Sequence, residues 1–408
     1  MRILVYSINY APELTGIGKF TAEMCDWFAA RGHEIRVVTT PPYYPDWKVR
    51  DGYSAWMWRG ETIKGVRVTR CPLWVPAKPS GVKRAVHLLS FALSSLPAML
   101  WQALRFRPDV VCTIKPPMFA EPVGWAAARL SGALAWTHVQ DLEVDAAFDM
   151  GLLPSGGLKK ATLAVDNWLL RRFDFATTIS LRMQERLWRK GAAHAKTGLY
   201  PNWVEAASIQ PQTGPNPYRA ELGIAPDQIV ALYSGNMGEK QGLDTLIDTA
   251  RAVAGDPNIA VVLCGEGAAR QRLQDGARGL ANVRFLPLQP LERLGDLLNL
   301  ADVHLLPQRA DAADLVMPSK LGGMLATGRP VIAGAHPGTQ VAMAVAGCGL
   351  VVPPDDGAAM AAALRMLAAD SAQRAALGTV ARQKALSDWD KDGILGRLER
   401  TLKDKIYP

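Results

Sequence analysis

A repeated alternation of short apolar runs with helix-patterned segments constrains the fold of this chain more than any other feature. Short buried strands that alternate with amphipathic helices predict mainly parallel sheets covered by helices on both faces. The first half holds six or seven such runs, among them 1–8, 34–40, 109–114 and 133–139. The alternation then restarts with runs at 230–233, 259–264, 283–286, 303–306, 331–333 and 350–352. The sequence therefore predicts an α/β chain of two Rossmann-like, doubly wound domains that face a central cleft.

A proline-rich stretch separates the two alternations. Residues 210–217 contain three prolines and show no apolar pattern, so we place the linker at 203–218. We expect an N-terminal domain at 1–203, a C-terminal domain at 204–388, and a helix at 389–408 that returns to the N-terminal domain. The five cysteines are scattered, which is neither a zinc pattern nor a disulfide framework, and their odd number fits a reducing cytosol.

The stretch 305–334 has the arrangement of a phosphate site. The apolar run before it ends at Pro307, and Met317-Pro318 opens a segment with helical spacing. This places Ser319 and Lys320 at a helix start, just beyond the carboxyl end of a strand, where open α/β sheets bind ligands. Backbone amides, a hydroxyl and an ammonium at that place suit a phosphate. The alternative is an ordinary strand–loop–helix with a surface lysine.

Two glycines, Gly16 and Gly18, follow the first strand. A dinucleotide fingerprint is excluded because Thr21 stands at the third glycine position and the strand that ends at Thr40 carries no acidic residue. The loop is either a tight turn or a segment that approaches a ligand bound between the domains.

Acidic residues cluster with a histidine after the run 133–139. His138, Asp141, Glu143 and Asp145 lie just past a strand's carboxyl end, the usual place for chemistry in this architecture. A single histidine there is equally a structural hydrogen-bonding group. The aromatic and proline-rich segment 41–60 either lines a sugar site or forms a packed loop, and we favour the packed loop.

An uncharged apolar segment, 85–104, is flanked by basic residues. It has fourteen apolar residues in twenty, and Pro97 is expected to break or kink any helix there. No Asp or Glu occurs from 62 to 108, whereas this region holds eight Lys and Arg residues, equal to the net charge of +8. Its flanking charges are Lys83, Arg84, Arg105 and Arg107.

This pattern predicts that residues 82–107 contact an anionic membrane surface. The alternative is a buried pair of helices. Nucleic acid is disfavoured, because the basic residues flank an apolar segment and are not interleaved with aromatics. No uninterrupted run of about eighteen apolar residues predicts a membrane span, and Arg2 leads straight into a strand, which argues against a signal peptide. We therefore expect a cytoplasmic protein, peripheral on the inner face of the cytoplasmic membrane.

Five motifs together resemble those of the GT-B glycosyltransferases, most closely retaining family 4, over nearly the whole chain. They are Tyr10-Ala11-Pro12-Glu13 with Gly16-Ile17-Gly18, Arg31-Gly32-His33-Glu34, Tyr233-Ser234-Gly235-Asn236, Ala301-Asp302-Val303 and Gly328-Arg329-Pro330-Val331. Within that family, the segments GNMGEKQGL, HVQDLEVDAAF and MPSKL resemble colanic-acid-type exopolysaccharide enzymes.

The resemblance implies transfer of a sugar from a nucleotide diphosphate donor, a GDP- or UDP-sugar, to a polyprenyl-diphosphate-linked saccharide. The donor is expected on the C-terminal domain and the acceptor against the N-terminal one. The residues expected to bind substrates are Gly16, Gly18, Gly235, Asn236, Gly238, Lys240, Gln241, Ser319 and Lys320.

Two departures from the family pattern affect the donor site. Many relatives hold the diphosphate with an Arg and a Lys five apart, positions that match Asn236 and Gln241, so Lys240 and Lys320 are the available cations. Many relatives also carry two glutamates, which match Leu315 and Gly323 here, so recognition of the ribose and donor sugar must differ.

The chemistry requires stabilisation of the charge that develops on the leaving diphosphate. No Asp-x-Asp motif follows a strand, so we expect neither a metal nor a cofactor. Lys320, Ser319 and the amides of 235–238 are expected to stabilise that charge, and His138 to position the donor sugar or the acceptor. Two alternatives stay open: a sugar-nucleotide epimerase, which has no need of the apolar segment 85–104, and a non-catalytic sugar-nucleotide-binding protein, which the missing glutamates allow.

Overall fold

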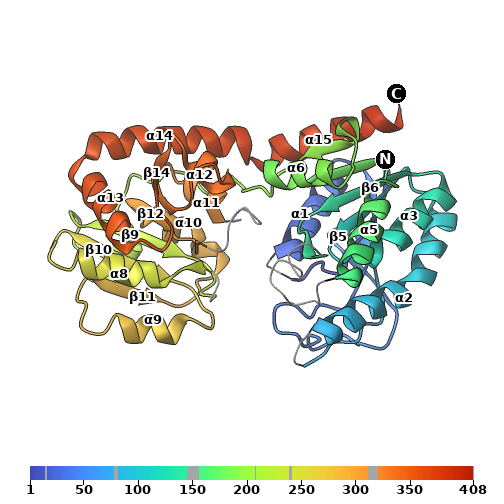
Figure 1. Cartoon of the computed structure of the whole chain (residues 1–408), viewed down its shortest axis with the longest axis horizontal. Coiled ribbons are helices and arrows are strands. Elements are labelled where there is room, and N and C mark those ends of the chain that lie inside the picture. The colour runs from blue at the N-terminus through green and yellow to red at the C-terminus, as the bar shows by residue number, and fades with distance from the viewer. Residues whose placement is uncertain are drawn as a thin grey trace. The chain divides into compact units, whose positions relative to one another are not determined.

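The computed structural model describes residues 1–13, 16–77, 81–144, 156–206, 208–238, 241–310 and 320–407. The chain divides into two compact units (Figure 1). Unit 1 comprises Met1–Pro201 and Leu395–Pro408, and unit 2 comprises Asn202–Ile394. Each unit is built around its own sheet, so the prediction of two Rossmann-like α/β halves is confirmed.

The sheet of unit 1 has the strand order β3-β4-β2-β1-β5-β6-β7-β8, and its neighbours are parallel except for the antiparallel β3–β4 pair. The central strands β5 and β6 are almost wholly buried, as expected of a sheet covered on both faces. The order reverses at β1, which lies between β2 and β5. Its strands are β1 (Arg2–Tyr6), β2 (Glu34–Thr39), β3 (Arg59–Ile63), β4 (Val66–Arg70), β5 (Val110–Lys115), β6 (Leu134–Val139), β7 (Phe175–Thr178) and β8 (Thr197–Leu199).

Helices of unit 1 follow its strands and carry the pattern of buried apolar residues that the sequence showed. The last of them, α15, begins in unit 2 and runs into unit 1, where Glu399 pairs with Arg31 and His33, each at 2.9 Å. The helices are α1 (Gly16–Ala30), α2 (Gly81–Phe106), α3 (Ala120–Ser131), α5 (Gly157–Leu170), α6 (Leu181–Arg189) and α15 (Lys391–Ile406).

Helix α2 is continuous through Pro97, so Pro97 does not break the helix, whereas a kink at that residue stays a prediction. A proline removes one helical N–H and leaves the carbonyl of the residue four positions earlier without its partner. Here both Pro97 and Leu93 are exposed, and water can satisfy that carbonyl. The other face of α2 packs into the core of unit 1 through Phe91, Met99 and Phe106.

Unit 2 holds six parallel strands in the order β11-β10-β9-β12-β13-β14. The order reverses between β9 and β12, and ligands of open α/β sheets bind beside such reversals, at the carboxyl ends of the strands. The strands are β9 (Ile229–Ser234), β10 (Ile259–Cys264), β11 (Val283–Leu286), β12 (Val303–Leu306), β13 (Val331–Gly334) and β14 (Gly349–Val352). The helices are α7 (Pro217–Glu221), α8 (Asp244–Ala252), α9 (Arg270–Gly276), α10 (Leu294–Asn299), α11 (Lys320–Ala326), α12 (Gln340–Val345), α13 (Gly357–Ala369) and α14 (Ser371–Asp388).

Candidate functional site

Two loops at the carboxyl ends of the unit 2 strands pack against each other without side chains between them. A Cβ on Gly265, after β10, would lie 1.9 Å from the carbonyl oxygen of Gly235, after β9. The φ angle of Gly265 is +149°, which L side chains rarely adopt, so position 265 requires glycine. The close approach fixes the path of the loop that begins at Gly235.

Lys320 reaches this loop from the first residue of α11. Its Nζ lies 4.0 Å from the centroid of the Tyr233 ring, a cation–π contact. A Cβ on Gly235 would lie 3.5 Å from the same Nζ, so the structure brings together Lys320 and Gly235, two residues that the sequence predicted for one site. Burial lowers the pKa of Lys320 to about 7, because the ammonium loses hydration. An anion bound beside Lys320 would favour the ammonium form.

The backbone amides predicted to bind the diphosphate are partly engaged. Gly235 donates its N–H to the carbonyl of Cys264 at 2.9 Å, and Met237 donates to Glu266 at 2.8 Å. The expectation that the amides of 235–238 together stabilise the leaving group is therefore wrong for these two, because backbone acceptors already hold their protons.

The other residues predicted to bind the donor, and the two positions where many relatives carry glutamates, lie as follows. Asn236 is exposed and Gly238 half-buried in the loop after β9, and the half-buried Gln241 donates its backbone N–H to Gly238 at 3.1 Å. Lys240, Ser319 and Leu315 lie outside the described residues. Gly323, where many relatives carry a glutamate, lies on α11, and a Cβ there would meet Leu298 at 3.4 Å. The Cβ of a glutamate at position 323 would therefore lie against an apolar side chain.

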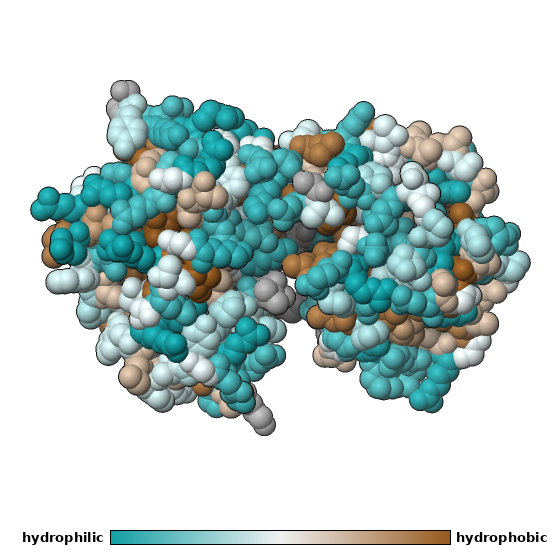
Figure 2. Space-filling view, turned by 180° about the vertical axis from the view of Figure 1, so that it is seen from behind, coloured by the Kyte–Doolittle hydropathy of each residue, from teal (hydrophilic) through white to brown (hydrophobic). Residues whose placement is uncertain are grey.

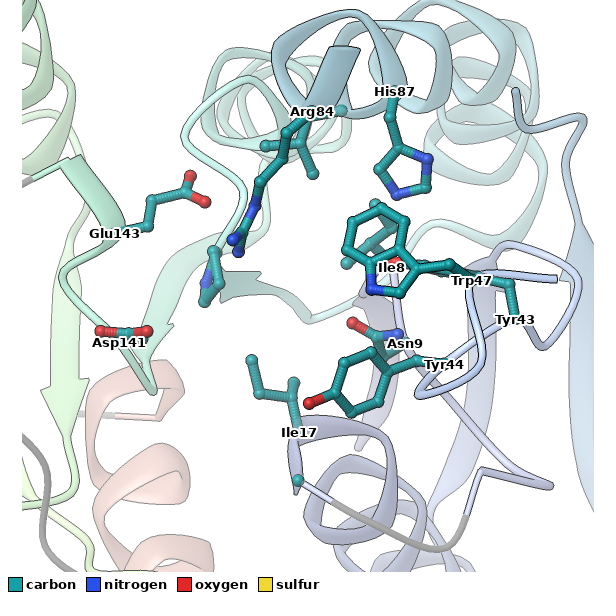
Figure 3. Close-up of a pocket in the computed structure, with 13 residues that line it drawn as sticks. Ile8, Asn9, Ile17, Tyr43, Tyr44, Trp47, Arg84, His87, Asp141 and Glu143 are labelled. Carbon is teal, nitrogen blue, oxygen red and sulfur yellow. The ribbon is translucent and has the colours of Figure 1, made fainter. Parts of the chain in front are cut away.

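Unit 1 contains a pocket of about 200 Å³ at the carboxyl ends of β1 and β5 (Figure 3). Asn9 lines it from the loop after β1, and Gly16 lines it from the first residue of α1. A second wall consists of the aromatic residues Tyr43, Tyr44 and Trp47. The segment 41–60 therefore lines a pocket as well as packing, and the packed-loop interpretation that we favoured is incomplete.

The missing side chain at Gly18 leaves room for the buried carboxylate of Glu13, which connects two walls of this pocket. Glu13 accepts hydrogen bonds from the backbone N–H groups of Tyr43 and Tyr44, at 3.0 and 2.9 Å, and from Nδ2 of Asn9 at 2.9 Å. A Cβ on Gly18 would lie 2.9 Å from Oε2 of Glu13. Gly18 thus has a packing role and Gly16 lines the pocket, while approach of the loop to a ligand bound between the domains stays a prediction.

Two of the four residues clustered after β6 face the pocket. Asp141 and Glu143 line it, whereas Asp145 lies outside the described residues. The carboxylate of Glu143 accepts a hydrogen bond from the backbone N–H of Met118 at 2.7 Å, and burial raises the pKa of Glu143. The prediction that acidic groups gather at this strand end therefore matches the position of these two residues.

His138 is buried in β6 and is not among the residues that line the pocket. Its Nδ1 is 2.8 Å from Oγ1 of Thr177, and the side-chain amide of Gln140 lies 3.0 Å from Nε2. Burial lowers the pKa of His138 to about 4, so the imidazole is neutral at pH 7. These contacts fit the structural alternative for His138, while a positioning role stays a prediction.

Arg84 and His87 also line the pocket, and sequence reasoning missed this role for both. Figure 3 shows Arg84 pointing from α2 toward Glu143, across from Trp47. The sequence pattern predicts Arg84 as one of the charges that flank a membrane segment, whereas the structure places it in the pocket. The helical spacing of Arg84, His87 and the buried Phe91 indicates one helix face, and this pattern is the signal that could have placed Arg84 and His87 together.

Among the described residues, no group of three or more His, Cys, Asp or Glu side chains is placed to hold a metal ion. Asp390 and Asp392 form an Asp-x-Asp sequence, but they flank Lys391, the first residue of helix α15, and do not follow a strand.

Comparisons with known proteins agree with both halves of this architecture. Residues 15–203 match the model of the glycosyl transferase 4-like domain, and residues 216–384 match that of glycosyl transferases group 1. A putative colanic acid biosynthesis glycosyl transferase, WcaI of Escherichia coli K12, is 41% identical over 405 residues, which cover 97% of this chain and 98% of the relative.

Solved structures of glycosyltransferases share the fold. Sucrose-phosphate synthase from Thermosynechococcus elongatus has a TM-score of 0.75 at 21% identity, with 99% of each chain covered. Anabaena HepE, in a crystal structure with UDP and glucose, has a TM-score of 0.69 at 16% identity, again with 99% of each chain covered.

Proposed function

This chain belongs to the GT-B glycosyltransferases, in the family that joins a glycosyl transferase 4-like domain to a group 1 domain, and we propose that it acts in exopolysaccharide synthesis. In this proposal it moves a sugar from a GDP- or UDP-sugar to a polyprenyl-diphosphate-linked saccharide, with retention of anomeric configuration and without a metal. The name of the Escherichia coli relative supports the pathway, and the UDP complex of Anabaena HepE supports a nucleotide donor.

The observation that carries the proposal is the position of Lys320 beside Gly235. Glycosyl transfer from a nucleotide sugar leaves negative charge on the departing diphosphate, and a fixed cation in a poorly solvated site stabilises that charge. The Tyr233 ring holds the Lys320 ammonium at the carboxyl end of β9. We assign the donor diphosphate to this place, and Ser319 and Lys240 stay predictions from the sequence because both lie outside the described residues.

His138 has a supporting role in this proposal. Its imidazole is neutral at pH 7 and only 5% exposed. Gln140, which follows it by two residues and is hydrogen-bonded to its ring, connects it to Asp141 at the pocket wall. His138 would therefore position the acceptor or donor sugar through its neighbours, without transferring a proton.

The membrane part of the proposal rests on one face of α2. Seven large apolar side chains on this helix are between 37% and 77% exposed and recur at helical spacing. We call them the outer face of α2: Val82, Val86, Leu89, Leu93, Leu96, Trp101 and Leu104. Single exposed apolar residues are ordinary on a protein surface, and Figure 2 shows them scattered among hydrophilic residues on one side of the molecule. A continuous stripe on one helix is different and indicates a partner.

A tryptophan segment extends this apolar surface. Trp56, Met57 and Trp58 are 74%, 65% and 56% exposed. The indole N–H of Trp58 donates to the backbone carbonyl of Ser94 at 3.1 Å, which fixes the segment against α2. Tryptophan prefers the boundary between lipid and water.

These features support the proposal that α2 lies on a membrane surface. By length and composition α2 is long and apolar enough to cross a bilayer, but its other face is packed in the core of unit 1. Lys83, Arg105 and Arg107 stand at its ends, where they can meet anionic headgroups. We therefore place the protein on the inner face of the cytoplasmic membrane, where lipid-linked acceptors are presented.

A donor screen tests the proposed reaction. Purified protein with a membrane extract should release UDP or GDP from one nucleotide sugar of a panel, and release should depend on the extract. Absence of extract-dependent release from every donor would contradict the proposal.

Vesicle sedimentation tests the membrane surface separately. Replacing Lys83, Arg105 and Arg107 with Gln should weaken binding to anionic vesicles at low salt, by about 1 kcal/mol for each charge. Arg84 is kept because it lines the pocket. In a matched control, three exposed arginines of unit 2 are also replaced with Gln: Arg251, Arg278 and Arg365. This control should bind anionic vesicles like the wild type. Equal, negligible binding of all three proteins would refute the membrane surface.

A further inference from the structure

We infer that Lys115 is a positioning residue for the pocket of unit 1, because it fixes the turn between β5 and α3 through a buried group of four charges. We call this group the buried charge cluster: Lys115, Glu121, Asp166 and Lys190. The inference rests on the proposed function only in giving the pocket a part in sugar transfer. Its support comes from the burial of the cluster, from the elements that it joins, and from the pocket residues that its turn holds.

The buried charge cluster ties four elements of unit 1 together. Lys115 is the last residue of β5, and its Nζ lies 3.0 Å from Oε2 of Glu121, in the first turn of α3. The same ammonium donates to Oδ1 of Asp166, on α5. Oδ2 of Asp166 lies 2.9 Å from Nζ of Lys190, which directly follows α6. The two ammonium groups balance the two carboxylates, as burial of charges requires.

Stability alone does not account for the buried charge cluster. Its four side chains are at most 8% exposed, so each charge has lost most of its hydration. The free energy of removing ions from water can exceed the attraction between them, and apolar residues of similar volume are often as stable. Among the described residues, Oε1 of Glu121 is also buried without a hydrogen-bond partner, which adds a further cost. The fixed geometry of the cluster is therefore the property that apolar residues would not supply.

The turn that the cluster holds carries two contacts of the pocket. The ion pair between Lys115 and Glu121 keeps the two ends of this turn together. Within the turn, Pro116 lines the pocket, and Met118 donates its backbone N–H to Oε1 of Glu143 at 2.7 Å. Glu143 itself lines the pocket, and Figure 3 shows its carboxylate directed into it. A shift of the turn would therefore move one pocket residue and free the carboxylate oxygen of another.

Packing fixes the elements on either side of the turn. A Cβ on Gly124, one turn after Glu121, would lie 1.9 Å from Oγ1 of Thr113, so α3 lies directly against β5. The backbone carbonyl of Lys115 accepts the N–H of Gln140 at 2.8 Å, which joins the carboxyl ends of β5 and β6. With the helix and both strands held in this way, the ion pair is the contact that determines how the turn closes.

A charge-balanced double variant of the full chain tests the inference. Lys115→Met with Glu121→Gln removes one charge of each sign, keeps similar side-chain volumes, and leaves Asp166 beside Lys190. We expect its urea unfolding midpoint to equal or exceed that of the wild type, because apolar replacements of buried ion pairs are often neutral or stabilising. The turn should loosen nevertheless, because no charged contact holds its two ends.

Hydrogen exchange measures the turn directly. Proline has no backbone N–H, so a peptide over residues 116–120 reports only Met118, Phe119 and Ala120. In the double variant the Met118 amide should exchange about tenfold faster or more, the loss of one hydrogen bond to a charged group. Amides of β5 and β6 should exchange as in the wild type. A role in stability alone would instead change exchange throughout unit 1.

Two further variants complete the test. Asp26→Asn with Lys64→Met removes a largely exposed ion pair of the same unit, and the turn of this control should exchange as in the wild type. Glu121→Gln alone keeps Lys115 beside Asp166 and should give a smaller increase in exchange than the double variant. This single variant carries the test if the double variant does not fold.

Turnover connects the turn to the reaction. With the donor that the screen identifies and a membrane extract, the double variant should release nucleotide about tenfold more slowly or less, since a displaced pocket group misplaces the sugar. Binding of UDP and GDP should match the wild type, because the nucleotide is assigned to unit 2.

Three results would overturn the inference. They are unchanged exchange of the turn in the double variant and in Glu121→Gln, faster exchange that extends equally to β5 and β6, or a loosened turn with wild-type turnover. The proposed function fails differently. Selective loosening of the turn, in a protein whose wild type releases no nucleotide from any donor, would leave the action of Lys115 on the pocket standing and reject the transferase reaction.

Discussion

Replacing Lys320 with Ala removes the cation on which the proposed leaving-group stabilisation depends. The ammonium lies 4.0 Å from the Tyr233 ring centroid, beside Gly235, and burial gives it a poorly solvated environment. A charge-assisted contact to a departing diphosphate in such a place contributes about 2–4 kcal/mol to the transition state. At about 1.36 kcal/mol for each factor of ten, turnover should fall by about 30- to 900-fold. Lys320→Met, which keeps most of the volume of the side chain without its charge, should lose a similar factor, because the charge and not the volume is responsible.

The pKa of Lys320 gives the same assignment an independent test. In the ligand-free protein it is lowered to about 7, and a bound diphosphate should raise it. The protein should therefore take up a proton when UDP or GDP binds near and above pH 7, and affinity should fall as the pH rises above 7. The linkage to stability has the opposite sign: the unfolded chain binds more protons than the folded one between about pH 7 and 10.5, so this group makes the ligand-free protein more stable as pH rises across that window.

Calorimetry and kinetics together measure both effects. Titration of UDP and GDP at pH 7.5 to 8, in two buffers with different ionisation enthalpies, reports proton uptake directly, and steady-state turnover reports the transition state. The uptake should disappear in Lys320→Ala. A folded variant with turnover within about threefold of wild type, or with unchanged proton uptake, would show that Lys320 does not contact the diphosphate.

Two further substitutions test other parts of the account. His138→Ala should lower turnover while leaving UDP and GDP affinity nearly unchanged, since His138 belongs to unit 1 and the nucleotide is assigned to unit 2; a large loss of nucleotide affinity with normal turnover would remove His138 from the reaction. Gly18→Ala would put a Cβ 2.9 Å from the buried carboxylate of Glu13, which three hydrogen bonds hold, and should cost about 1–3 kcal/mol of unfolding free energy in urea denaturation. Gly60→Ala, whose Cβ meets nothing within 4 Å, is its control, and equal stabilities of the two variants would contradict the packing argument.

The strands that form the centre of each sheet were predictable, because they are buried on both faces and read as continuous apolar runs. Strand β10 was predicted at 259–264 and lies at Ile259–Cys264. The β3–β4 pair was not predicted, since β3 reads RGETI and is mostly exposed, without the apolar pattern that marks a buried strand.

Contacts between distant segments explain most of what the sequence did not show. Lys115 is buried between the carboxylates of Glu121 and Asp166, and Asp166 also pairs with Lys190 at 2.9 Å. Nothing in the spacing of four charged residues across 75 positions indicates that they meet in the core of unit 1. The pocket shows the same limit. Asp141 and Glu143 were predictable because they follow a strand, whereas only the course of α2 in the structure places Arg84 opposite them.

Transfer of label from a nucleotide sugar into lipid tests the central claim most directly. The protein is incubated with radiolabelled GDP- and UDP-sugars and a membrane extract, and the organic and aqueous phases are separated. The account predicts label in the lipid fraction with one donor, and loss of that label in Lys320→Ala. A new nucleotide sugar in the aqueous phase would identify an epimerase, and retention of the unchanged donor by the protein would identify a binding protein; either result would contradict the transferase assignment.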